Sequence, residues 1–156
     1  MDPTALADYR SATAAFLAAA TRVEPADLDR RHEGEWSARQ VIHHLADSET
    51  QSSTRLRRLL AEPGTLIQGY DEGAWAACPT LGYEELPVEH ALAVIRAVRT
   101  ATADLLERLA PEDLALEGVH SESGPYNVAT WLEIYTRHPL EHARQLAESL
   151  TAPDGR

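Results

Sequence analysis

Residues 36–49, WSARQVIHHLADSE, contain the clearest helix start in the chain. Ser37 and Gln40 have the S-x-x-Q spacing of a capping box, in which the serine hydroxyl accepts from the Gln40 amide and the glutamine side chain bonds back to the serine. Trp36 and Val41 flank this box at the spacing of a hydrophobic staple. The sequence therefore predicts a helix over residues 37–61.

The inward face of this helix is apolar but carries polar residues at regular intervals. His44 lies one turn into the face, and Ser48 and Ser52 follow it at helical spacing. Small polar side chains on an otherwise apolar face predict a cavity at this point.

Three further stretches have the apolar periodicity of helices, at residues 3–23, 87–109 and 127–150. Signals for strands are sparse. The predicted fold class is all-α, a four-helix bundle in which two long connections act as crossovers. The connection at residues 62–86 is longer than most loops in compact domains, and such loops are usually functional or disordered. Its aromatic residues, which include Tyr70 and Trp75, favour order.

Length and composition favour a single cytoplasmic domain over residues 1–156. The chain is 44% hydrophobic, which excludes a disordered protein. Its longest apolar run, residues 14–20, is shorter than the ~20 residues of a membrane span. The acidic start lacks the basic region of a secretion signal. One cysteine, Cys78, forms no internal disulfide, which is typical of a reducing compartment.

The charge pattern indicates which partners are unfavourable. The formal net charge is −11, and all 14 basic residues are arginine. A phosphate backbone repels an acidic domain, so nucleic acid is not expected as a partner. The absence of lysine excludes a Schiff-base mechanism. The basic cluster of Arg55, Arg57 and Arg58 is predicted to be a solvated helix face.

Two histidines on the last predicted helix continue its apolar stripe. His138 and His142 lie four residues apart, so both imidazoles can face one ion. Two inward imidazoles need partners, because an unpaired buried polar group costs about 1–3 kcal/mol. His44 supplies a third inward imidazole, and three nitrogens between two helices make an open metal site. Hydrogen-bonded core histidines without a metal are the alternative.

For the other residues that could carry chemistry, the sequence does not predict a catalytic role. Pro139 removes the N–H that would bond to the Tyr135 carbonyl, which predicts a kink or local unwinding beside the site. Asp47 and Glu141 flank two of the histidines and are either partners that orient an imidazole or ordinary surface carboxylates. A small apolar role is expected for Cys78, and solvent exposure is expected for the remaining histidines, with a proton shuttle as the alternative at His120.

Three motifs together resemble one known family. They are GEWSARQVIHHLADSE at residues 34–49, the Tyr70-Asp71-Glu72 segment followed by Trp75, and the pattern from His120 to His142 that contains Tyr135-x-x-His138. They resemble the DinB/YfiT superfamily of metalloenzymes. This resemblance implies an up-down-down-up four-helix bundle that holds one divalent transition metal through His44, His138 and His142. Zn or Ni is favoured, with Co or Fe as alternatives.

The branch most similar in appearance is that of the metal-dependent bacillithiol S-transferases, also described as metal-dependent hydrolases. This resemblance implies a small electrophilic substrate, a low-molecular-weight thiol as possible co-substrate, and a lid that contains Tyr70 and Trp75. A non-catalytic metal- or small-molecule-binding bundle is the alternative. A homodimer is a further expectation, although no face of the sequence indicates it.

Overall fold

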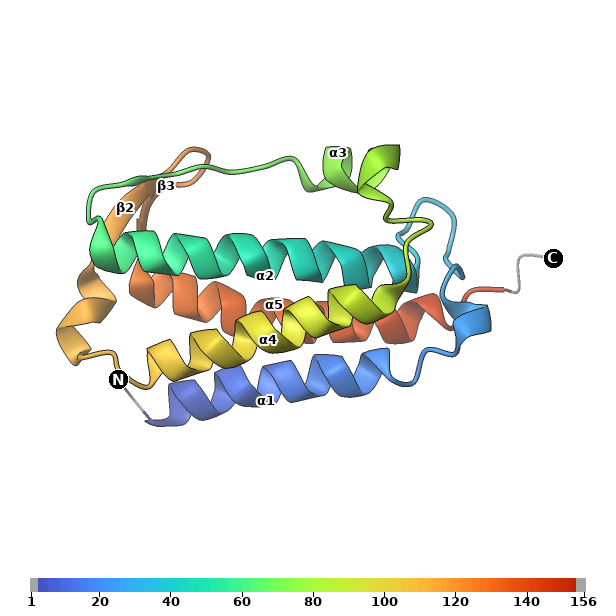
Figure 1. Ribbon diagram of the computed structural model, residues 1–156, viewed down its shortest axis with the longest axis horizontal. Helices are drawn as coiled ribbons and strands as arrows, with labels where there is room; N and C mark the ends of the chain where they lie inside the picture. The colour runs from blue at the N-terminus through green and yellow to red at the C-terminus, as the bar shows by residue number, and fades with distance from the viewer. Residues whose placement is uncertain (1–2, 154–156) are drawn as a thin grey trace.

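The computed structural model describes residues 3–153, which form a bundle of four long helices. The helices are α1 (Pro3–Ala20), α2 (Ala38–Ala61), α4 (Val88–Leu106) and α5 (Val128–Ser149). Helices α1 and α5 run in one direction, and α2 and α4 run in the other (Figure 1). Helix α1 packs against α5 and α4, and α2 packs against the same two helices. The predicted up-down-down-up bundle is confirmed.

Local signals explain the ends of these helices. The Ser37 hydroxyl accepts from the Gln40 backbone N–H at 3.3 Å, and the Gln40 side chain accepts from the Ser37 N–H at 3.0 Å, so the predicted capping box forms. The predicted extension of the first helix to residue 23 is wrong. The helix ends at Ala20 because the N–H groups of Arg22 and Val23 bond three residues back, to the carbonyls of Ala19 and Ala20, which tightens the chain out of the α-helix ahead of Pro25. Helix α4 likewise ends at Leu106 rather than at residue 109, ahead of Pro111.

The connection at residues 62–86 is structured, which corrects its description as a loop. It contains β1 (Leu66–Ile67), the short helix α3 (Glu72–Ala77) and a 3₁₀ turn at Pro79–Leu81. The segment crosses the length of the bundle alongside α2 (Figure 1). The connection from α4 to α5 stays at one end of the bundle, so one connection rather than two acts as a crossover.

A small sheet at that end of the bundle was not predicted. Strand β2 (Glu117–His120) pairs parallel with β1 and antiparallel with β3 (Gly124–Asn127). A Cβ added at Gly118 would lie 2.5 Å from the Thr65 carbonyl oxygen, so only glycine allows this close approach. Strands of two to four residues are too short to show an alternating pattern in the sequence.

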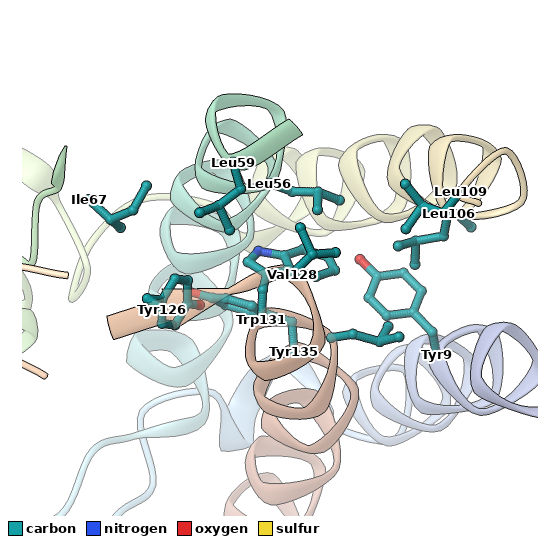
Figure 2. Packing of buried hydrophobic residues seen from close by; sticks show 12 residues of the cluster. Tyr9, Leu56, Leu59, Ile67, Leu106, Leu109, Tyr126, Val128, Trp131 and Tyr135 are labelled. Carbon is teal, nitrogen blue, oxygen red and sulfur yellow. The ribbon is translucent and has the colours of Figure 1, made fainter. Parts of the chain in front are cut away.

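The core consists of two apolar clusters. Figure 2 shows the first, in which the indole of Trp131 lies among side chains that include Tyr9 and Leu56. The Trp131 indole is fully buried and donates to the Ser52 carbonyl oxygen at 2.9 Å. The second cluster contains Phe16, Ile42, Leu45, Ile95 and Leu146. On each long helix, the buried residues of the second cluster are separated from those of the first by about two to three turns.

A polar layer fills this interval between the two clusters. Arg99, which is 1% exposed, pairs with the buried Glu49 carboxylate at 2.6 Å. Its guanidinium also donates to the Tyr9 carbonyl at 3.1 Å and to the Thr13 hydroxyl at 2.5 Å. Arg99 therefore contacts all three of the other long helices, because a further bond reaches Tyr135 on α5 at 3.0 Å.

Pro139 is accommodated by this layer. Helix α5 continues through Pro139 from Val128 to Ser149, so the expected local unwinding is wrong. The Tyr135 carbonyl, which Pro139 deprives of its usual helical donor, accepts instead from Arg99.

None of the helices in residues 3–153 combines the length and apolar character that crossing a bilayer requires.

We predict that Arg99→Met lowers the free energy of unfolding by about 3–5 kcal/mol, because it leaves the Glu49 carboxylate buried without its partner. Urea denaturation monitored by circular dichroism measures the loss. The double variant Arg99→Met/Glu49→Leu recovers most of it, since both charges are then removed. A loss below about 1 kcal/mol in the single variant would contradict a structural role for the pair.

Candidate metal centre

Three imidazoles from two facing helices converge in the bundle. His44 comes from α2, and His138 and His142 come from α5. One nitrogen from each ring lies within 4.8 Å of those of the other two. The Nε2 atoms of His138 and His142 are 2.9 Å apart. The structure thus brings together the three histidines that the sequence places on inward faces.

The hydrogen bonds of these rings fit a metal better than a metal-free core. The His142 Nδ1 atom lies 2.8 Å from the Gln145 side-chain oxygen, so Nδ1–H donates there and the lone pair of Nε2 faces His138. Both ring nitrogens of His44 and the Nδ1 of His138 are buried without a hydrogen-bond partner. A divalent transition ion that accepts one lone pair from each ring would give His44 the partner that the protein does not supply. Core histidines without a metal require partners that these atoms lack.

Burial keeps the three imidazoles neutral at neutral pH. It lowers the pKa of His44 to about 3, with a further contribution from His142. It lowers the pKa of His138 to about 2, and the neighbouring His142 and His44 act in the same direction. The pKa of His142 is also lowered by burial, against opposing effects of Gln145 and Glu141. Neutral imidazole is the form that binds a metal ion.

A cavity of about 210 Å³ adjoins the centre at His138. It gives the histidine cluster a route to solvent, which a catalytic metal site needs and a closed structural site lacks. Side chains from α2, α3, α5 and the hairpin line it, namely Ser48, Arg55, Glu72, His120, Ser123, Tyr126, Ile134, Tyr135 and His138.

Glu72 is the carboxylate nearest to the imidazoles. Its Oε2 atom lies 3.9 Å from the His44 Nε2 atom. Asp71 caps α3 by accepting from the Ala74 N–H at 2.8 Å, which fixes the turn that carries Glu72. Burial raises the pKa of the Glu72 carboxyl, nearby Arg55 opposes this shift, and Glu122 adds to it. A carboxylate with a raised pKa beside the centre is suited to accepting a proton.

Of the four residues predicted to form the pocket, one lines the cavity and the other three do not. Ser48 lines the cavity, whereas Ser52 lies outside its lining and presents its carbonyl to Trp131. The rings of Tyr70 and Trp75 pack on each other with centroids 4.5 Å apart. The Tyr70 hydroxyl is buried beside Ser48. The crossover therefore brings an aromatic pair next to the cavity.

Asp47 and Glu141, which flank two of the imidazoles in sequence, take other partners. Asp47 accepts from the Tyr83 hydroxyl at 2.7 Å. Glu141 pairs with Arg137 at 3.0 Å on the exposed side of α5. The first contact joins the crossover to α2 and the second lies within α5, so neither carboxylate bonds to an imidazole.

Several residues of the site were not predicted. Arg55 was expected on a solvated face but is half-buried in the cavity lining, an expectation that the structure contradicts. A signal was present, because Arg55 lies two turns after Ser48 and so shares its face. His120, expected in solvent, lines the same cavity, and the Trp36 ring lies 4.9 Å from that of His44.

Comparisons with known proteins agree with this arrangement. A model of the DinB superfamily matches residues 8–146. A relative from Oceanobacillus iheyensis named "Putative metal-dependent hydrolase" is 38% identical over 109 residues, which are 70% of this chain and 62% of that protein. A relative of the same type of name from Bacillus mycoides is 33% identical over 120 residues, which are 75% of this chain and 68% of that protein. The matched segment thus spans less than two thirds of the Oceanobacillus protein.

A solved structure shares the fold. YfiT from Bacillus subtilis, described as a probable metal-dependent hydrolase with an unusual four-helix bundle topology, aligns with a TM-score of 0.85. The alignment covers 94% of this chain and 83% of that chain at 24% sequence identity.

We predict that the purified protein, prepared without a tag or chelator, carries about one equivalent of a transition metal and that His44→Ala carries almost none. Elemental analysis by mass spectrometry measures both. His43→Ala is the matched control, because His43 is adjacent on α2 but contacts Tyr83 and the Leu86 carbonyl instead. A full equivalent of metal in His44→Ala would refute the assignment of this ligand.

We also predict that the metal-free protein loses stability as the pH falls below about 6.5. The three imidazoles have lowered pKa values only in the folded state, so the unfolded chain binds more protons below its own pKa. Each histidine then lowers the free energy of unfolding by up to about 1.4 kcal/mol per pH unit, and the stability is fully present above that range. Urea midpoints across this range test the slope. His138→Gln should reduce it, and His32→Gln, at an exposed site, should not.

Proposed function

The chain belongs to the DinB superfamily, and from this premise we propose that it is a divalent-metal-dependent hydrolase acting on a small substrate. The observation that carries the proposal is the convergence of three neutral imidazoles, with both nitrogens of His44 unpaired, beside a cavity that a carboxylate also lines. The names of the two relatives support the same reaction class.

The chain's own residues have separate roles in this proposal. His44, His138 and His142 hold the ion, with Gln145 orienting His142 through its Nδ1–H. A divalent ion held there supplies a Lewis acid and lowers the pKa of a water or thiol that it contacts. Zn or Ni suits three nitrogen ligands best, with Co or Fe as alternatives.

Glu72 is the candidate general base. Its carboxylate lies 3.9 Å from the His44 Nε2 atom, at the edge of the cavity, and burial raises its pKa toward the value at which proton transfer is efficient. Tyr70 and Trp75 pack together on the same crossover, and the Glu72 side chain is 51% exposed, so solvent reaches this carboxylate. A small-molecule substrate fits the size of the cavity.

Thiol transfer is the second candidate reaction. A separate cavity of about 380 Å³ lies on the other side of Trp36, whose ring is 4.9 Å from that of His44. This space favours a bound co-substrate, such as a low-molecular-weight thiol, that reaches the centre from the α3 side. A non-catalytic binding bundle is the alternative if neither reaction occurs.

We predict that Glu72→Gln retains the metal but lowers kcat about 10²-fold, because it removes a proton acceptor without removing an imidazole. The metal-loaded protein is assayed with 4-nitrophenyl acetate for hydrolysis, and with a thiol and monochlorobimane for transfer. Glu107→Gln is the matched control, since Glu107 is exposed, pairs with Arg10 and lines neither cavity.

The assay separates the candidates. Full hydrolysis by Glu72→Gln would overturn the role of Glu72, whereas activity with the thiol alone would favour transfer. Metal binding without either activity would favour the non-catalytic bundle.

A further inference from the structure

One cation in the cavity lining has a donor that the protein leaves unused. The Arg55 Nη1 atom donates to the Tyr135 hydroxyl at 3.0 Å, and Nη2 donates to the Gln68 carbonyl at 2.9 Å. Its guanidinium carbon lies 5.9 Å from the centre of the Tyr70 ring. These contacts fix the guanidinium plane, but the Nε atom is buried and has no hydrogen-bond partner.

Arg55 thus differs from the other buried guanidinium. Arg99 pairs with the Glu49 carboxylate at 2.6 Å, whereas the two hydrogen-bond acceptors of Arg55 are a phenol and a carbonyl, both of them uncharged. A buried Nε–H without an acceptor costs about 1–3 kcal/mol. Arg55 therefore lines the cavity without a carboxylate hydrogen-bonded to it, and an anionic ligand would supply one.

A second donor lines the same cavity. The backbone N–H of Glu122 donates to the His120 Nδ1 atom at 3.3 Å, so the neutral ring carries its proton on Nε2. His120 and Arg55 both line the cavity beside His138. The hairpin and α2 therefore each contribute a side chain with N–H donors to the lining of one small space.

The charge and size of the cavity restrict the kinds of ligand that it can bind. The cavity volume of about 210 Å³ lies below the 300–1,000 Å³ typical of pockets for drug-sized molecules, so the ligand is small. Glu72 lies on the His44 side of the cavity and repels an anion there. Arg55 attracts an anion, so the two charges orient a ligand that has one anionic end.

We propose that Arg55, assisted by His120, binds the carboxylate of a small carboxylate-bearing substrate and thereby directs its reacting bond toward the three-histidine centre. A guanidinium is suited to a carboxylate, because its N–H donors and the two carboxylate oxygens lie in one plane. The bonds to Tyr135 and Gln68 use one N–H on each Nη atom of Arg55, which leaves a second N–H on each of them for the ligand. The inference rests on the proposed hydrolase function for the identity of the reacting centre, but the binding step itself needs no metal.

The competing explanation is that Arg55 has only a structural role, as a link between two segments. Its bonds to Gln68 and Tyr135 join the crossover to α5 and would serve that purpose alone. If Arg55 has only this structural role, anionic and neutral ligands should bind with the same affinity. The two explanations therefore differ in the selectivity of the intact protein.

The test uses metal-free, ¹⁵N-labelled protein at neutral pH, titrated with propionate and with propionamide, which have the same shape and differ in charge. Arginine Nε–H resonances report binding, and the Arg55 signal is assigned by its loss in Arg55→Gln. We expect propionate to shift this signal and to bind about tenfold more tightly than propionamide, as for a charge-assisted hydrogen bond. Arg55→Gln should abolish the preference.

Arg57→Gln is the matched control and should keep the preference for propionate. It makes the same change of charge on the same helix, at an exposed residue that bonds only to Ser53. Equal binding of the two ligands by the wild type would overturn the proposal, as would a preference that survives in a folded Arg55→Gln protein. If Arg55→Gln does not fold, the wild-type comparison and His120→Gln, which should weaken propionate binding, decide the matter.

The outcome is independent of hydrolysis because no ion is present. Propionate selectivity in a protein that shows no metal-dependent activity would leave the carboxylate site intact and remove the proposed function. Metal-dependent hydrolysis without selectivity for propionate would support the proposed function and refute the carboxylate site.

Discussion

The buried ion pair between Arg99 and Glu49 is the interaction on which the arrangement of the bundle depends. From α4, the guanidinium reaches the Glu49 carboxylate on α2, two acceptors on α1 and one carbonyl on α5. Apolar side chains tolerate many packings, but a buried charge tolerates only the one that gives it partners. The pair therefore favours one set of axial positions of the four helices relative to one another. In that arrangement His44 on α2 lies opposite His138 and His142 on α5.

Tyr135 connects this layer to the cavity. Its backbone carbonyl, freed by Pro139, accepts from Arg99, and its hydroxyl accepts from Arg55. A proline that would weaken an isolated helix is here part of the polar network, because the acceptor it exposes is used by a cation from another helix. His138 and His142 lie within two turns of that point on the same helix.

The segments outside the four helices supply the chemistry around the imidazoles. The crossover contributes Glu72 and the pair of Tyr70 and Trp75, and the hairpin contributes His120. The sheet holds the two segments together, since Ile67 on β1 is in register with His120 on β2. The bundle thus brings the three imidazoles together, while connecting segments line the cavity beside them.

The sequence by itself determined the helices, the cap at Ser37 and the inward faces of His44, His138 and His142. These features follow from local periodicity, because a turn of 100° per residue assigns each side chain to a face before any tertiary contact forms. Only the tertiary structure decided that Arg55 is half-buried, that Glu72 lies beside His44 and that short strands join the crossover to the hairpin. Long side chains choose their partners among groups far apart in the chain, such as Arg55 and Tyr135, which are 80 residues apart. Two- and four-residue strands exist only because a neighbour pairs with them, so their formation is a property of the assembled fold.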